Sequence, residues 1–199
     1  NNEPDFIIDF DNIASNIIIT FDQCNFSNLE CNYAAGGIGL WFTTKDTNRY
    51  QSIVFKDSTF EHISHDSSSG GGAISFVEAS DNNNNKNYVS IQSCSFYDIS
   101  TTNSGGAIHF ESKKELKIDD CSFEQIHSNK GSNSIYVKKS DLDMVTINSC
   151  KFFDCKNDQY SYQVELSVPN LEFNYNSFTF SDKNCGCVKL DYIGKHTFF

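Results

Sequence analysis

The sequence predicts an all-β protein, a parallel β-helix in which about three short strands make up each coil. Two observations predict it: one motif recurs along the 199-residue chain, and the apolar residues of each copy alternate as they do in strands. No segment between the copies shows helical periodicity, and strong helix formers are scarce. A repeat of 26–29 residues with three strands and no helix is typical of one coil of a β-solenoid.

Each copy of the motif centres on a phenylalanine that follows a cysteine or a polar residue by two positions. Apolar residues recur seven and five positions before this anchor, and a further one roughly twelve positions after it starts a period-2 segment. Because alternate side chains of a strand face the same side, like residues of successive coils should stack inside the solenoid. The six anchors are Phe26, Phe60, Phe96, Phe123, Phe152 and Phe178.

The stretch "SGGAIHF" (104–110) repeats the earlier stretch "GGGAISF" (70–76). Each opens a strand after a polar bend, so we interpret the two glycines as a tight corner. Glycine allows positive φ there and lets neighbouring coils approach closely, and Ala73 and Ala107 are small for the same reason. A phosphate-binding loop is disfavoured, because no helical pattern follows and the lysine of a P-loop is missing.

We expect residues 1–199 to form one β-helix domain, or a segment of a longer solenoid. The two longest repeats carry inserts at 43–51 and 77–88, and both should bulge from the same corner. Neither end of the sequence shows a polar amphipathic cap, and uncapped coils expose backbone and apolar rows. This pattern indicates either a longer solenoid or self-association through the solenoid ends, unless the C-terminal "HTFF" folds over the last coil.

At "CSFYDISTTNSGGAIHF" (94–110) the sequence resembles the repeats of the chlamydial polymorphic outer-membrane proteins and their relatives in protists. The resemblance covers roughly residues 18–190. The six anchors predict about six coils. The resemblance implies that the parallel β-helix is right-handed and belongs to a cell-surface or secreted protein used for adhesion or as a structural rod. It implies no catalytic residues.

Four of the eight cysteines lie two positions before an anchor phenylalanine and should face inward with it: Cys24, Cys94, Cys121 and Cys150. Small free thiols suit such a stack, and in-register strands hold stacked side chains in poor geometry for a disulfide. The other four are Cys31, Cys155, Cys185 and Cys187. A disulfide between Cys155 and Cys185 or Cys187 stays open. The "CGC" stretch lacks the further ligands of a zinc site, so we expect no metal and no cofactor.

The outward positions of the strands that follow the glycine corners form a candidate ligand face. Stacked residues lie one coil apart, so a base, carboxylates and an aromatic ring would be neighbours. The face comprises Trp41, His109, Glu111, Tyr136, Lys138 and Glu165. We interpret it as a solvated surface with charge pairs between coils, Glu111 with Lys138 and Glu165 with Lys189.

The alternative is a polysaccharide lyase or hydrolase, or a carbohydrate-binding β-helix, that uses the face around His109, Glu111 and Tyr136. Glycoside hydrolysis needs two carboxylates roughly 5–9.5 Å apart. Glu111 and Glu165 are two coils apart, about 9.6 Å by coil spacing, and nothing in the pattern focuses them in a cleft. We therefore predict that the chain is not an enzyme and has no catalytic residues.

The formal net charge of −11 disfavours nucleic acid and anionic membranes as partners. No run of 18 apolar residues occurs, so no membrane span is predicted. The sequon "NFS" (25–27) makes Asn25 a candidate N-glycosylation site, because it lies between two inward side chains and should face solvent. We expect an extracellular or cell-surface module that binds a protein or a glycan through its exposed strand faces and inserts.

Overall fold

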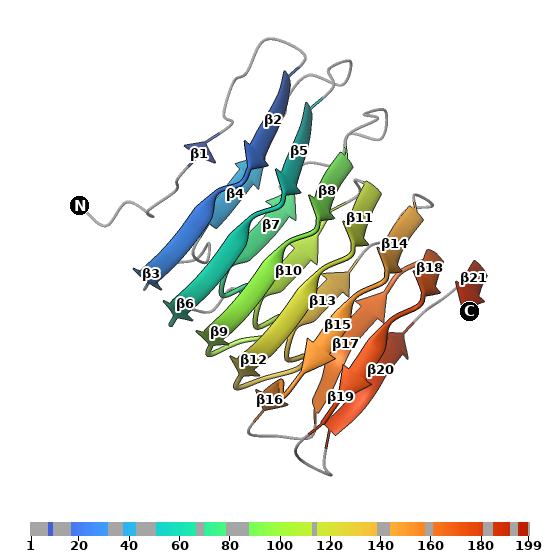
Figure 1. The fold of residues 1–199 in the computed structure, drawn as a ribbon. Helices are drawn as coiled ribbons and strands as arrows, with labels where there is room; N and C mark the ends of the chain where they lie inside the picture. Colours follow the sequence, from blue (N-terminus) through green and yellow to red (C-terminus); the bar gives the residue numbers. More distant parts are fainter. Residues whose placement is uncertain are drawn as a thin grey trace.

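The computed structural model describes residues 8–9, 17–31, 38–42, 51–66, 70–78, 88–112, 115–138, 144–157, 161–180, 185–191 and 195–198. Within these ranges the regular elements are all β-strands, and no helix occurs. The strands form three parallel sheets, named A, B and C, in which strands far apart in the sequence stack in chain order (Figure 1). The predicted all-β parallel solenoid is confirmed, while its handedness and its number of coils stay predictions.

The chain visits the three sheets in turn, so each strand inside a sheet pairs with one from the preceding and one from the following repeat. Sheet A has the order β1 (Ile8–Asp9), β4 (Ile38–Phe42), β7 (Ile74–Glu78), β10 (Ile108–Glu111), β13 (Ile135–Lys138), β17 (Ser161–Ser167) and β20 (Cys185–Asp191). Sheet B has β2 (Ile17–Asp22), β5 (Gln51–Lys56), β8 (Tyr88–Gln92), β11 (Glu115–Asp119), β14 (Met144–Asn148), β18 (Asn170–Asn174) and β21 (Lys195–Phe198). Sheet C has β3 (Asn25–Cys31), β6 (Thr59–His65), β9 (Ser95–Thr101), β12 (Ser122–Ser128), β15 (Lys151–Phe153) and β19 (Ser177–Thr179), with β16 (Lys156–Asn157) also pairing with β12.

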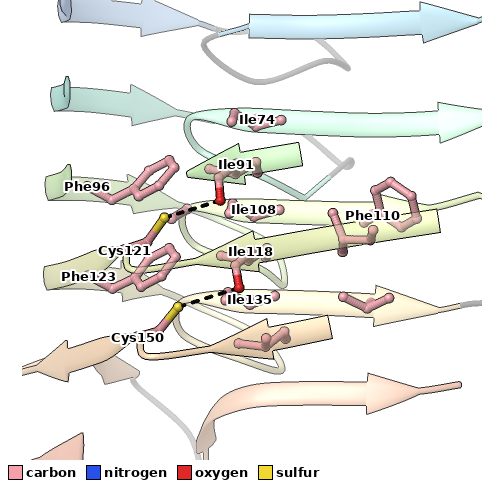
Figure 2. Packing of buried hydrophobic residues seen from close by; sticks show 14 of the residues in the cluster. Ile74, Ile91, Phe96, Ile108, Phe110, Ile118, Cys121, Phe123, Ile135 and Cys150 are labelled. Atoms are coloured by element: carbon pink, nitrogen blue, oxygen red, sulfur yellow. Dashed lines mark hydrogen bonds between the residues drawn. The ribbon is translucent and has the colours of Figure 1, made fainter. Parts of the chain in front are cut away.

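The strand register places the repeated apolar residues one above another. From Phe26 to Phe178 the anchor rings stack with centroids 4.7–4.9 Å apart and planes within 14° of parallel. Figure 2 shows this stack at Phe96 and Phe123, beside a second column in which Ile91 and Ile118 face the same interior. Burial of each such ring contributes about 1.5–3 kcal/mol, and the stacking adds to it, so this column forms the spine of the core.

A single left-handed residue turns the chain from sheet B to sheet C. At Asp57, for example, φ is 49° and the amide donates to the carbonyl oxygen of Gln92 in the next repeat, at 3.0 Å. Asp tolerates this conformation better than most residues. The same corner recurs at Gln23, Asp57, Ser93, Asp120, Ser149 and Tyr175.

A second left-handed residue lies inside most strands of sheet C and explains an irregular spacing in the sequence. Phe96 and Ile99 are both buried, although a strict two-residue alternation would turn one of them outward. Asp98, with a φ of 50°, is the extra residue between them and is left out of the pairing with β12. It acts as a stacked β-bulge that returns the second apolar side chain to the core.

The glycine motif forms the corner from sheet C to sheet A, as predicted. Gly71 and Gly105 have φ values of 82° and 70°. A Cβ atom on Gly72 would overlap the carbonyl oxygen of Gly106 and lie 2.6 Å from Cγ2 of Ile99. The first glycine therefore provides the backbone conformation, and the second provides room for the isoleucine of the neighbouring coil.

Some predictions fall outside the described residues or are corrected by them. Most of both inserts, 43–50 and 79–87, lies outside the described ranges, and the extent of the domain stays a prediction. Residues 196–198 belong to β21, which extends sheet B by pairing with β18, so a cap folded over the last coil is wrong for them. Across the described ranges, no helix has the length and hydrophobicity required to cross a bilayer.

Candidate functional site

The candidate face lies on the outer side of sheet A, where the register confirms the predicted columns. Two parallel rows of outward residues run across β10, β13, β17 and β20. One row consists of His109, Tyr136, Glu165 and Lys189, and the other of Glu111, Lys138, Ser167 and Asp191. Glu111 and Glu165 are two strands apart, as expected.

His109 contacts two other members of this face. Its Nε2 atom lies 3.3 Å from Oε1 of Glu111, and its ring stacks on Tyr136 with centroids 4.9 Å apart and planes at 29°. Only 12% of the His109 side chain is exposed, and its Nδ1 atom is buried without a hydrogen-bond partner. The imidazole is therefore packed into the surface and is not free to approach a ligand from solution.

Tyr136 is half-buried within the same stack. Burial raises the pKa of its phenol, and the carboxylates of Glu111 and Glu165 raise it further. Because the His109 ring covers one face of Tyr136, that face cannot serve as a stacking platform for a sugar. The phenol stays neutral at physiological pH and acts as a spacer between two acidic side chains.

Glu165 binds the lysine of the next strand, which confirms one predicted charge pair. Lys189 Nζ lies 2.8 Å from Glu165 Oε1 and 2.9 Å from Asp191 Oδ2. These two carboxylates raise the pKa of Lys189, so the ammonium group stays charged. Asp191 was not among the predicted site residues, although its place in the outward row follows from the period-2 pattern.

The row of His109, Tyr136 and Glu165, which Ser75 of β7 continues, is more buried than the sequence pattern indicates, whereas Lys138 in the other row is exposed, as expected of a solvated face. Ser75 is only 3% exposed, and the Glu165 side chain only 14%. The glycine corners are one cause, because a Cβ on Gly71 or on Gly105 would lie 3.0 Å from Cβ of His109 or of Tyr136. The corner of one coil thus packs against the outward side chain of the next, a contact that alternation along a strand does not reveal.

Glu111 has the wrong electrostatic setting for a general acid. The hydrogen bond from His109 is the main cause that lowers its pKa, and Lys138 lowers it too, against an opposing effect of burial. The proton donor of a glycosidase needs a raised pKa. This carboxyl is instead held in its charged form.

The other predicted site residues are placed as follows. Trp41 lies in β4 and pairs with Val77, which in turn pairs with Glu111. The backbone of Trp41 is therefore two strands from that of Glu111, and the side chain of Trp41 lies outside the described part. Lys138 is exposed. Asn25 is exposed as predicted, and its Nδ2 donates to Glu61 Oε1 at 3.4 Å.

The inward cysteines act as hydrogen-bond donors to corner carbonyls. Cys121 Sγ donates to the carbonyl oxygens of Asp119 at 3.3 Å and Ile91 at 3.5 Å, the second of which is drawn in Figure 2. Ser58 occupies the same column, and its hydroxyl donates to the carbonyl of Lys56 at 2.8 Å. The adjacent Cys150 thiol and burial raise the pKa of Cys121. Such a thiol is a structural donor and a poor nucleophile.

The open question of a disulfide is answered for two cysteines. Cys155 has a buried thiol and Cys187 an exposed thiol, and neither forms a disulfide, so a disulfide between Cys155 and Cys185 or Cys187 is wrong. The side chains of Cys31 and Cys185 lie outside the described part. Among the described residues, no group of three or more His, Cys, Asp or Glu side chains could hold a metal ion.

No family model, curated protein or solved structure matches this chain. The kinship indicated by the Gly-Gly-Ala-Ile motif therefore stays a prediction from the motif.

Proposed function

We propose that this chain is a non-catalytic structural or adhesive module of a cell-surface or secreted protein, built as a right-handed β-helix of six three-stranded coils. The observation that carries the proposal is the ring stack from Phe26 to Phe178, which passes through every repeat. A continuous aromatic spine makes neighbouring coils mutually dependent and favours a rigid rod.

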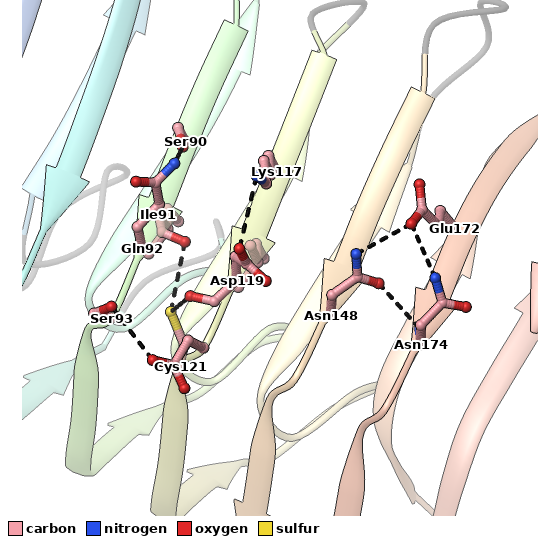
Figure 3. Close-up of polar contacts among 12 residues, drawn as sticks. Ser90, Ile91, Gln92, Ser93, Lys117, Asp119, Cys121, Asn148, Glu172 and Asn174 are labelled. Atoms are coloured by element: carbon pink, nitrogen blue, oxygen red, sulfur yellow. Dashed lines mark hydrogen bonds and ion pairs between the residues drawn. The ribbon is translucent and has the colours of Figure 1, made fainter. Parts of the chain in front are cut away.

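The outer faces support the same proposal, because their polar groups are paired with one another. On sheet A, Lys189 neutralises Glu165. On sheet B, the side-chain amides of Asn148 and Asn174 both donate to Glu172 Oε1, at 3.2 and 2.9 Å (Figure 3). Such ladders hold adjacent coils in register and leave few groups poised for chemistry.

The edge at β20 supports self-association. Leu190 faces inward, in register with the fully buried Leu166, yet 39% of it is exposed. Cys187 on the same strand is exposed as well. A further coil pairing with β20 would cover these side chains and the backbone edge, whether it came from a second copy or from an adjoining segment. End-to-end assembly into filaments follows if second copies provide it.

Sedimentation velocity over a wide concentration range, with electron micrographs of the same samples, tests this proposal. We expect concentration-dependent growth into linear particles, and we expect Leu190→Lys to abolish that growth while leaving the circular dichroism spectrum unchanged. The matched control is Lys138→Gln on the outer face, which should assemble normally. A chain that stays monomeric at every concentration would contradict the end-to-end assembly.

The clustering of His109, Glu111 and Tyr136 on one face favours the alternative, a carbohydrate-binding or polysaccharide-active surface. Depolymerisation assays on acidic and neutral polysaccharides, together with a glycan array, distinguish the two. Our proposal expects no depolymerisation. Turnover that is lost in Glu111→Gln and kept in Glu124→Gln would establish the alternative.

A secretory route is tested at Asn25. Expression through a eukaryotic secretory pathway should yield a glycosylated protein whose mass falls on treatment with an N-glycosidase. Asn25→Gln and Ser27→Ala should both remove this shift, since the enzyme that attaches the glycan needs both residues. An unmodified Asn25 in the secreted protein would remove this support for an extracellular location.

A further inference from the structure

A buried polar corner lies between sheets C and A, where the chain enters β13 and β17. One column at this corner has a larger side chain in each successive repeat: Ala107 before β10, Ser134 before β13, and Gln163 within β17. The amide of Ala107 donates to the carbonyl of Ser134 at 3.0 Å, and the amide of Ser134 donates to the carbonyl of Gln163 at 2.9 Å. All three residues are fully buried.

Gln163 has no hydrogen-bond partner for its side chain. Both its Nε2 and its Oε1 atoms are buried and unpartnered, and so is the hydroxyl of the nearby Ser132. A primary amide can donate two hydrogen bonds and accept two. Leaving one such buried group unsatisfied costs about 1–3 kcal/mol, and nearly all buried polar groups are satisfied by protein or by ordered water.

The corner is polar but carries no charge, which identifies the kind of ligand that fits. Its described members are Ser128, Ser132, Asn133, Ser134, Cys155 and Gln163. Burial raises the pKa of the Cys155 thiol to about 11, against a lowering effect of Ser134, so the thiol is protonated at neutral pH. None of these six side chains is charged at neutral pH; the charge that acts on the corner is the carboxylate of Asp154, which also raises the pKa of Cys155. A neutral ligand fits these groups, and water needs only two to four polar partners.

The core residue at this level is smaller than in the preceding repeats. Ile99 and Ile126 fill the corresponding position in the two preceding repeats, and Cys155 replaces them here. The shorter side chain leaves room for polar side chains where the other coils have glycine and alanine. Buried polar atoms that no protein group satisfies are normally satisfied by ordered water.

We propose that this corner binds internal water, held by the side-chain amide of Gln163 and the hydroxyls of Ser132 and Ser134. The water bridges the repeat that contains β13 to the repeat that contains β17. Its ligands are neutral, so binding is independent of added salt and of pH near neutrality.

Two measurements on the intact chain test the proposal. A high-resolution crystal structure should show ordered water within about 3 Å of the Gln163 amide. In solution, the Gln163 side-chain NH₂ should give an NOE to water of the sign that marks a long-lived, bound molecule. Gln163→Met, which replaces the amide with an apolar side chain of similar length, should lose both signals. The control is Gln92→Met in β8 of sheet B, where the Gln92 amide donates to Ser90 Oγ at 2.9 Å; this variant should keep the water at the Gln163 corner.

A crystal structure in which the Gln163 amide bonds directly to protein groups, with no water beside it, would overturn the proposal. Because this result needs only the wild-type chain, it decides the matter even if Gln163→Met fails to fold.

Discussion

The side-chain amide of Asn133 donates a hydrogen bond to the carbonyl oxygen of Cys155 at 3.3 Å, in a position where other coils place a glycine against an isoleucine. A Cβ on Gly72 would lie 2.6 Å from Ile99, and a Cβ on Gly106 would lie 2.5 Å from Ile126. The larger residue at the corner is therefore matched by a smaller residue in the core, and the two positions act as a pair.

This pairing predicts strong coupling between Asn133 and Cys155. Cys155→Ile alone should overpack the corner and destabilise the fold by about 1–3 kcal/mol. Asn133→Gly alone should cost about 0.5–1.5 kcal/mol, because it removes the hydrogen bond to the carbonyl oxygen of Cys155. The double variant restores the arrangement of Gly106 and Ile126, so its loss should be smaller than the sum by about 0.5–3 kcal/mol. Urea denaturation of the four proteins measures this coupling, and additive losses would show that the positions are independent.

The aromatic spine predicts a large effect at its centre. Phe123→Ala should lower the free energy of unfolding by about 3–5 kcal/mol, because it removes a fully buried ring and two stacking contacts. Phe153→Ala is the control, since this ring lies on the outer face of sheet C and is 48% exposed. Its effect should be much smaller, and similar losses for the two variants would refute the claim that the stack is the spine of the core.

The thiol column predicts that a hydroxyl can replace a thiol. Cys121→Ser keeps a donor for the carbonyls of Asp119 and Ile91, as Ser58 does for Lys56, and should cost less stability than Cys121→Val, which has a similar shape and no donor. Thermal unfolding monitored by circular dichroism ranks the two variants. A valine variant as stable as the wild type would show that the thiol only fills space.

The free thiols also predict a labelling pattern. In the native state Cys94, Cys121, Cys150 and Cys155 should resist alkylation, because they are buried and their thiol pKa values are raised or their Sγ atoms engaged. Cys187 should react, though slowly near neutral pH, because partial burial raises its pKa. Peptide mass spectrometry after a timed pulse identifies the modified residues, and rapid labelling of Cys121 in the folded protein would be inconsistent with the column.

The lowered pKa of Glu111 predicts a loss of stability in acid. The fold favours the charged form of Glu111. The contribution of Glu111 to the free energy of unfolding is therefore fully present above the ordinary glutamate pKa of about 4.3, and it disappears as the pH falls through the lower pKa that Glu111 has in the folded protein. Glu111→Gln should therefore be less stable than the wild type at neutral pH, with a difference that shrinks in acid. The control for loss of one carboxylate is the exposed Glu124→Gln, and a constant offset for Glu111→Gln across this range would contradict the assignment.

The sequence predicts the inner columns well, because each apolar column repeats chemically similar residues at fixed distances from the anchor. It also predicts that Tyr136 lies between His109 and Glu165, since counting outward from the glycine corner determines the register. Two features escape such counting. The left-handed bulge is occupied by residues as different as Asn28, His62 and Gln125, so no residue type marks it.

The burial of the outer face is the second feature that the pattern misses. His109 and Tyr136 are covered partly by contacts from the glycine corners of adjacent coils, and those contacts depend on three-dimensional packing rather than on alternation along one strand. The same reason explains Asn133. In the sequence, Asn133 stands where the preceding coils have Gly72 and Gly106. Its reason becomes clear only in the structure, where it contacts Cys155.

A crystal structure of the chain tests the central claim, that like side chains of successive repeats lie directly over one another, most directly. The account predicts that the rings of Phe96, Phe123 and Phe152 form one column with centroids 4.8 and 4.9 Å apart. Electron density that places these three rings in separate parts of the interior, or that shows helices between the strands, would contradict it.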